Sequence, residues 1–155
     1  ALDWRTWFLT FFYFVSFGGF IALTVWLPTY WAELFGAGMV RAGLFTAAFS
    51  LSTSLLRVAG GLFSDRVGGE RAVLISFVVV AAGSLLMMTA ERSLLAAFSG
   101  QMTLALGMGV ANAAVFKLVP RFTPKAVGGA AGIIGGLGAF GGFVLLQIPI
   151  DILQV

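Results

Sequence analysis

The chain has 155 residues, of which 60% are hydrophobic and only 10% are charged, and its net charge at pH 7 is +3. Its mean hydropathy of +1.05 lies far outside the range of soluble domains. The absence of cysteine and histidine excludes disulfides, thiol chemistry and most transition-metal sites. We therefore expect a membrane protein that is not an enzyme, has no catalytic residues, and needs no metal or cofactor.

Long apolar runs recur along the chain between short charged interruptions. Each run is long enough to cross the ~30 Å hydrocarbon layer, which needs roughly 20 helical residues. The runs do not alternate polar and apolar residues, as the strands of membrane barrels do. They predict an all-α, polytopic transmembrane helix bundle with five spanning helices: Trp7 to Trp31, Ala42 to Ser64, Ala72 to Ala90, Leu94 to Leu118, and Ala126 to Ile150. No domain boundary is visible within residues 1–155.

The loop charges predict how the bundle is oriented in the lipid bilayer. One side, which holds the N-terminus and the second and fourth loops, carries Arg5, Arg66, Arg71, Lys117, Arg121 and Lys125, and the other carries Arg41 and Arg92. By the positive-inside rule the N-terminus is cytoplasmic, and we expect an integral protein of a bacterial inner membrane. No basic stripe with interleaved aromatic residues points to a nucleic-acid partner.

The first predicted helix has a polar and aromatic face. Thr10, Tyr13, Phe17, Phe20 and Thr24 follow steps of three or four residues. Tyr13 lies about 9 Å inside Trp7, deeper than an interfacial belt requires. A tyrosine hydroxyl buried at that depth needs a hydrogen-bond partner, although packing alone also explains Tyr13 and Phe17.

The second predicted helix carries an arginine well inside an apolar run. Arg57 precedes Asp65 by eight residues, which places it about 12 Å from the cytoplasmic loop. Such an arginine costs at least ~2.5 kcal/mol and nearly always faces protein or a water-filled cavity. Small and polar residues follow the same helical steps and predict one stripe: Ser50, Thr53, Ser54, Arg57, Gly60, Gly61 and Ser64. The guanidinium suits a small planar anion, or else it pairs with helix carbonyls or an acid.

Polar and small residues also mark the last two predicted helices. Gln101 and Asn112 favour hydrogen bonds between helices rather than substrate contact. The last helix, "AVGGAAGIIGGLGAFGGF", repeats glycine every four residues, with Gly132 and Gly136 as examples. Such spacing lets another backbone approach closely. Tight packing is one interpretation of these glycines, and a wall along a narrow substrate path is the other.

The segment "GGLFSDRVGGER" resembles the loop signature of the major facilitator superfamily through Gly61, Asp65, Arg66, Gly68 and Arg71. The resemblance implies a cytoplasmic gate in which Asp65, Arg66 and Gly61 take part. Asp65 lies where it can make charge-assisted contacts to an arginine or to the N-terminus of a neighbouring helix. A solvated turn without a gating role is the alternative.

Three phrases together, "FFYFVSFGGFIALTVWLPTYW", "SLLRVAGGLFSDRVGG" and the glycine-rich phrase, resemble the nitrate/nitrite porter family of that superfamily. The resemblance covers helices seven to eleven, in the C-terminal half. It implies that Arg57 is a substrate arginine, that Tyr13 hydrogen-bonds the anion, that Phe17 sandwiches it, and that Gly135 and Gly138 belong to the wall beside it. We expect residues 1–155 to be a fragment, with the last helix and the N-terminal half absent.

The resemblance implies transport of nitrate or nitrite by alternating access, either as nitrate/nitrite antiport or as nitrate uptake. The partners implied are the nitrate or nitrite anion, the lipid bilayer and the remaining half of the transporter. Two other functions stay open. One is transport of another small oxyanion or a carboxylate, which competition among anions would detect. The other is a membrane interaction fragment without transport, whose association would not depend on anions.

Overall fold

The computed structural model describes residues 3–90 and 93–147, and nearly all of them are helical. The elements in chain order are α1 (Trp4–Tyr13), a π-helix η1 (Phe14–Gly18), α2 (Gly19–Phe35), α3 (Met39–Val67), α4 (Gly69–Met88), α5 (Leu94–Phe122) and α6 (Val127–Leu146). Because α1, η1 and α2 are continuous, these elements form five helices long and apolar enough to cross a membrane. The five predicted spans are confirmed, and the chain is an integral membrane protein.

The helix ends differ from the predicted ones. The first helix begins at Trp4 and continues to Phe35, and α5 continues through Pro120 to Phe122. Helices extend beyond the hydrocarbon length because turn residues, and not hydropathy, end them. Gly36 stops α2 with a φ of 60°, a left-handed conformation that favours glycine. The predicted end at Ile150 and the loop charge Arg92 lie outside the described residues.

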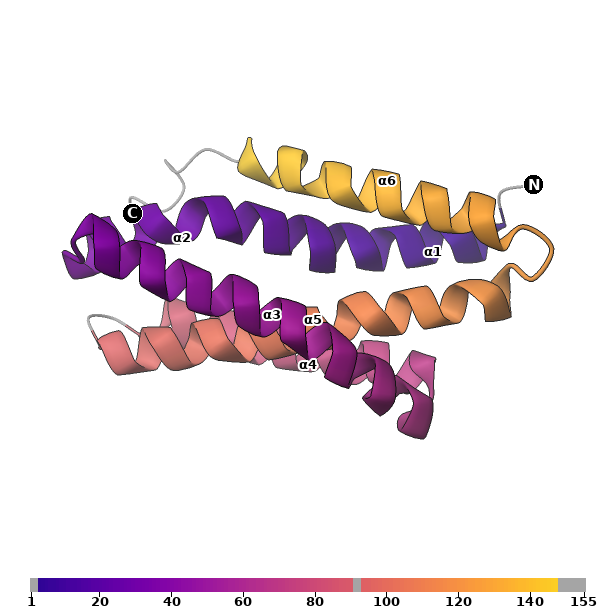
Figure 1. Ribbon diagram of the computed structural model, residues 1–155, viewed down its shortest axis with the longest axis horizontal. Helices are drawn as coiled ribbons and strands as arrows, with labels where there is room; N and C mark the ends of the chain where they lie inside the picture. The colour runs from indigo at the N-terminus through magenta and orange to yellow at the C-terminus, as the bar shows by residue number, and fades with distance from the viewer. Residues whose placement is uncertain (1–2, 91–92, 148–155) are drawn as a thin grey trace.

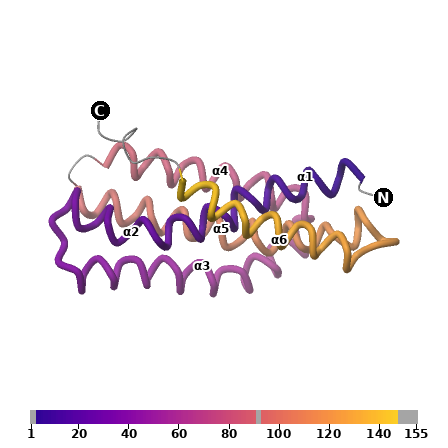
Figure 2. Tube along the Cα trace, turned by 90° about the horizontal axis from the view of Figure 1, so that it is seen from above, coloured from indigo at the N-terminus to yellow at the C-terminus, as the bar shows by residue number. Residues whose placement is uncertain are grey.

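The helices run lengthwise past one another and alternate in direction (Figure 1). The start of α1, the α3–α4 connection and the α5–α6 connection lie at one end of the bundle, as the loop charges require. Helix α5 packs closely against α3 and α4, while α6 packs against the long first helix, as the two views show (Figures 1 and 2). The long first helix lies between α6 and α3 in the view of Figure 1.

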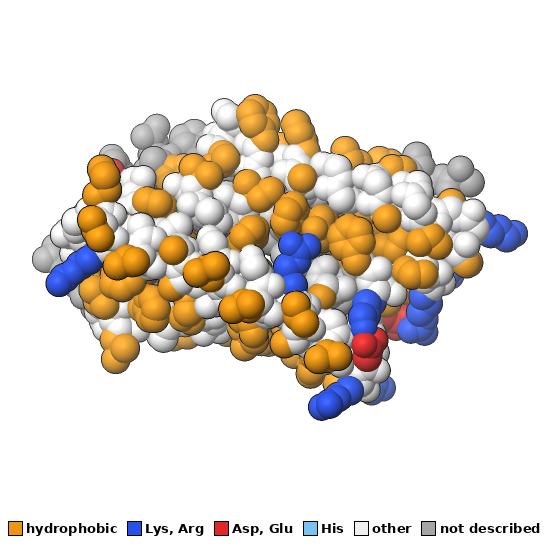
Figure 3. Space-filling view, viewed as in Figure 1, with side chains coloured by type: hydrophobic (Ala, Val, Ile, Leu, Met, Phe, Trp, Pro, Cys, Tyr) orange, Lys and Arg blue, Asp and Glu red, His pale blue; other side chains and the backbone are white. Residues whose placement is uncertain are grey.

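Helix α5 is the central element of the bundle. In its most apolar stretch 61% of the residues are buried, compared with 22% to 33% in the other four spans. Glycines allow the close approach to α4: a Cβ on Gly107 would lie 2.8 Å from the backbone nitrogen of Val80 and the carbonyl oxygen of Ser76. The outer faces of the other helices remain apolar and exposed, and hydrophobic side chains cover much of the face in Figure 3.

Gln101 confirms the prediction of hydrogen bonds between helices. Its side-chain Oε1 accepts from Trp31 Nε1 at 2.8 Å, and its Nε2 donates to the Phe45 carbonyl at 2.8 Å. One fully buried amide therefore joins α5 to both α2 and α3. Asn112, also in α5, has no hydrogen-bond partner among the described residues for either side-chain atom.

Candidate functional site

Arg57, Tyr13 and Phe17 come together midway along the bundle. Arg57 Nη2 donates to the Tyr13 hydroxyl at 3.3 Å, and the guanidinium carbon lies 5.4 Å from the centre of the Phe17 ring. The rings of Tyr13 and Phe17 stack at 5.0 Å with an angle of 16° between their planes. The π-helix begins directly after Tyr13 and contains Phe17. The guanidinium of Arg57 and the stacked rings of Tyr13 and Phe17 thus share one site between α3 and the first helix.

The glycine-rich helix α6 completes one wall of this cluster. A Cβ on Gly138 would lie 3.1 Å from Tyr13 Cγ and closer still to Cδ1, so only glycine fits there. A Cβ on Gly135 would lie 3.7 Å from Phe116, whose ring meets the Tyr13 ring edge-on at 4.8 Å. Gly138 therefore contacts the cluster directly, and Gly135 reaches it through Phe116.

The glycines of α6 serve two different faces. Gly138, Gly141 and Gly142 face the first helix, where Gly141 and Gly18 bring the two backbones together. In contrast, Gly132 and Gly136 have nothing within 4 Å of an added Cβ among the described residues. The packing interpretation therefore holds for Gly138, Gly141 and Gly142, and the wall along a substrate path stays a prediction.

Arg57 keeps donors for a further partner. It is half-buried, and none of the ion pairs among the described residues includes it. Its hydrogen bond to Tyr13 uses one edge of a guanidinium that carries several N–H donors. Basic atoms lie near the middle of the hydrophobic face in Figure 3, and the other charges gather at the ends. This arrangement can hold a small planar oxyanion against the guanidinium and the aromatic rings.

The predicted polar stripe on α3 divides between two surroundings. Thr53, Gly60 and Ser64 are buried, and a Cβ on Gly60 would lie 2.6 Å from Val110 Cα of α5. Ser54 is exposed and donates to the carbonyl of Ser50. The stripe is therefore wider than one face, because the small residues in it serve helix packing while Arg57 faces the site.

The predicted gate residues lie at the end where α3 meets α4. Asp65 forms an ion pair with Lys117 of α5, whose Nζ also donates to the Gly61 carbonyl at 2.8 Å. Arg66 is exposed at the end of α3. A lysine thus occupies the place where an arginine or a helix N-terminus was expected. One turn further along α5, Arg121 lies 3.6 Å from Glu70 of α4.

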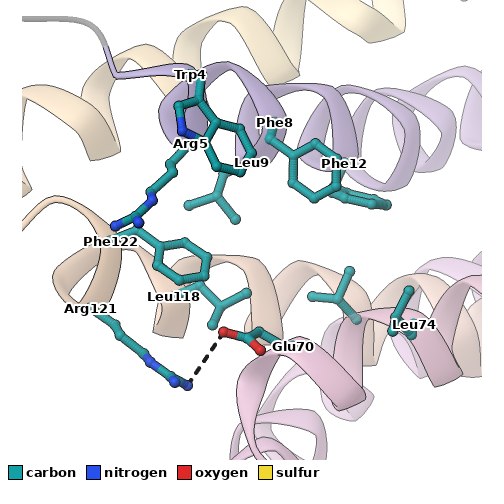
Figure 4. A pocket seen from close by; sticks show the side chains of 11 residues that line it. Trp4, Arg5, Phe8, Leu9, Phe12, Glu70, Leu74, Leu118, Arg121 and Phe122 are labelled. Carbon is teal, nitrogen blue, oxygen red and sulfur yellow. Dashed lines mark ion pairs between the residues drawn. The ribbon is translucent and has the colours of Figure 1, made fainter.

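A groove of about 610 Å³ lies at the same end of the bundle (Figure 4). Aromatic and aliphatic side chains of α1, α4 and α5 line it, with Arg5, Arg121 and Glu70 among them. None of the predicted substrate-binding residues lines this groove. It is therefore separate from the cluster around Arg57.

Sequence reasoning missed two contributors to the site. Phe116 was hidden among the apolar residues of its helix, yet it bridges Tyr13 and Gly135. Lys117 entered only as a loop charge, although it forms an ion pair with Asp65, one of the predicted gate residues. Lys117 and Arg121 lie four residues apart at the end of a spanning helix and therefore share one face of it. This spacing was the sequence signal that both could form ion pairs at that end of the bundle.

Comparison with known proteins identifies the fold family. The family model for the Major Facilitator Superfamily matches residues 1–146. The chain is 37% identical to the "Probable nitrate/nitrite antiporter NarK1" of Thermus thermophilus, over 91% of this chain and 36% of the relative. It is 39% identical to the "Nitrite extrusion protein" of Bacillus subtilis, over 88% of this chain and 34% of the relative.

A "Probable nitrate transporter NarT" of Staphylococcus epidermidis is 30% identical, over 91% of this chain and 36% of the relative. The chain thus spans about a third of the length of the curated relatives it matches. No solved structure matches it significantly.

Proposed function

This chain belongs to the major facilitator superfamily, and from that premise we propose that it forms helices seven to eleven of a nitrate or nitrite transporter. In this proposal the chain supplies half of the substrate site, and the remaining half of the transporter supplies the other. The protein lies in a bacterial inner membrane with the start of α1 on the cytoplasmic side, which agrees with the basic loops at that end.

The contact of Arg57 with Tyr13 and Phe17 carries the proposal. Nitrate and nitrite are small and planar, and a guanidinium offers coplanar donors to their oxygens. The Tyr13 hydroxyl lies 3.3 Å from the same guanidinium and supplies a further donor. Phe17, stacked on Tyr13, gives a flat apolar surface for the face of the anion. Gly135 and Gly138 keep the wall beside the site free of side chains.

In this proposal the cytoplasmic end of this half takes part in alternating access. The ion pair of Asp65 with Lys117 links the α3–α4 connection to α5 on the cytoplasmic side, and it must break or shift when that side opens. Arg66 and Gly61 belong to the same gate. The open glycines of α6 let the second half of the transporter slide past without colliding with side chains.

The test is anion-dependent stabilisation of the purified complete transporter. A ligand that binds only the folded state at a hundred times its Kd raises the stability by about 2.7 kcal/mol. We expect nitrate or nitrite to raise the Tm of the wild type and of Arg41→Lys, an exposed control, but not of Arg57→Lys. Chloride and formate should have little effect. Equal stabilisation of the wild type and Arg57→Lys would refute the proposal, and a larger effect of formate would assign the site to carboxylates.

A further inference from the structure

Among the described residues, three buried side chains have polar atoms without a hydrogen-bond partner: Ser16, Ser64 and Asn112. Ser64 lies at the cytoplasmic end of α3, whereas the other two lie in η1 and α5. Ser16 and Asn112 are each 1% exposed, and Ser16 Oγ and both polar atoms of the Asn112 amide lack partners among the described residues. Buried hydroxyl and amide groups are nearly always hydrogen-bonded, because burial removes the water that would otherwise satisfy them. Neither residue belongs to the site around Arg57.

The packing of η1 against α5 places the two residues opposite each other. The first helix and α5 run antiparallel (Figure 1). Tyr13 meets Phe116 at 4.8 Å between ring centres, and a Cβ on Gly19 would lie 3.2 Å from Met108 Cε. Ser16 lies midway between Tyr13 and Gly19 in sequence, and Asn112 lies midway between Met108 and Phe116.

The other helix that packs on η1 lies on a different face. Within η1, helix α6 packs against Phe14 and Gly18. Phe14 and Gly18 flank Ser16 by two residues on either side, so they point roughly the opposite way. Ser16 therefore faces α5, where Asn112 lies at the same level.

The π-helix changes the backbone hydrogen bonding at this level. The backbone N–H of Gly19 is shared between the carbonyls of Val15 and Ser16. Such π-turns interrupt the regular ladder of hydrogen bonds and occur frequently at functional sites. The unpartnered hydroxyl of η1 and the unpartnered amide of α5 thus lie at this interruption of the ladder.

We propose that Ser16 and Asn112 form a binding site for one water molecule, which bridges η1 to α5 behind Tyr13 and Phe17 and holds Tyr13 against Arg57. A water both donates and accepts, so it matches the two polar atoms of the amide and the hydroxyl together. An ion fits less well. A cation would have no neutralising charge, because all the described acids are exposed. An anion would have no charged partner at the site.

The direct test is a structure of the complete transporter at a resolution that reveals ordered water. The wild type should have a density peak within hydrogen-bond distance of Ser16 Oγ and the Asn112 amide, and Asn112→Leu should lack it. A direct hydrogen bond between the two side chains, or an empty space between them, would overturn the water site. This measurement does not depend on nitrate.

The positioning role rests on the proposed function and is tested by nitrate affinity. Ser16→Ala and Asn112→Leu should each raise the Kd for nitrate about threefold to tenfold, the effect of losing one hydrogen bond. Because both changes remove the same bridge, the double variant should be no weaker than the weaker single variant. Ser76→Ala is the control, since Ser76 is equally buried but bonds only to the Ala72 carbonyl of its own helix.

The outcomes separate the two proposals. Wild-type nitrate affinity in both single variants, or additive losses in the double variant, would overturn the positioning role. If Asn112→Leu does not fold, Ser16→Ala, which removes only a hydroxyl, gives the same comparison. Nitrate binding that survives Arg57→Lys, with the water peak in place, would instead refute the proposed function and leave the water site standing.

Discussion

Replacing Gly138 by alanine tests whether the Tyr13 ring must lie against α6. The added Cβ would lie 3.1 Å from Tyr13 Cγ and 3.2 Å from Cε1, with Cδ1 closer still. Carbon atoms in contact prefer separations of roughly 3.5 to 4.0 Å, so the ring must move by about 1 Å or the helices must separate. Overpacking of this kind typically costs about 1–3 kcal/mol.

A displaced Tyr13 cannot keep its contacts on both sides. Its hydroxyl lies 3.3 Å from Arg57 Nη2, already near the upper limit for a hydrogen bond, and its ring stacks on Phe17. Hydrogen bonds to charged groups contribute about 1.5–3 kcal/mol. We therefore expect Gly138→Ala to weaken nitrate binding at least tenfold, since a factor of ten corresponds to about 1.4 kcal/mol.

The assay is the nitrate Kd of the purified complete transporter, measured by calorimetry or by the shift in Tm. Gly43→Ala is the control, because Gly43 is an exposed helical glycine with nothing within 4 Å of an added Cβ among the described residues. Its Kd should equal that of the wild type. The reasoning fails if Gly138→Ala binds nitrate as tightly as Gly43→Ala does.

Two further predictions concern the gate and the core. Asp65→Asn should slow transport while changing the stability by less than ~1 kcal/mol, because the pair with Lys117 is largely exposed; the charge swap Asp65→Lys with Lys117→Asp should recover part of the rate, and no recovery would argue against a specific latch. Gln101→Leu should lower the free energy of unfolding by about 2 kcal/mol, because it leaves the buried Trp31 Nε1 unpaired and removes the second bond accepted by the Phe45 carbonyl. Its nitrate-dependent rise in Tm should match that of the wild type, and a loss of that rise would place Gln101 in the substrate site.

The spanning helices were predictable because hydrophobic length alone decides whether a segment can cross a bilayer. Their ends were not, since Gly36 and the backbone around it fix where α2 stops. The π-helix was also beyond prediction from sequence, because no periodicity in residues 14–18 distinguishes it from an α-helix. Hydropathy therefore predicts the spanning helices but not where they end or where they depart from regular α-helix.

The site was predictable in its residue types and less so in its geometry. Arg57 stood out because a charge in an apolar run needs a partner or a water-filled cavity, and Tyr13 also lay well inside its helix. The difference between Gly138, pressed on Tyr13, and Gly136, open on its outer side, depends on how α6 is rotated against its neighbour. The four-residue spacing of the glycines alone does not predict how α6 is rotated against the first helix. Phe116 was missed for the same reason.

The pairing of the first helix with α6 sets the order in which this protein can assemble. Helix α5 finds α3 and α4 among its immediate predecessors in the chain, whereas Tyr13 meets Gly138 only after 125 further residues have been made. At ribosomal rates of about 5–20 residues per second, the first helix waits roughly 6 to 25 s in the membrane before its glycine partner emerges. During that time the side of the first helix that α6 later covers is open to lipid or to membrane chaperones. Changes in α6 should therefore act late in biogenesis, on a chain whose central three-helix unit has already formed.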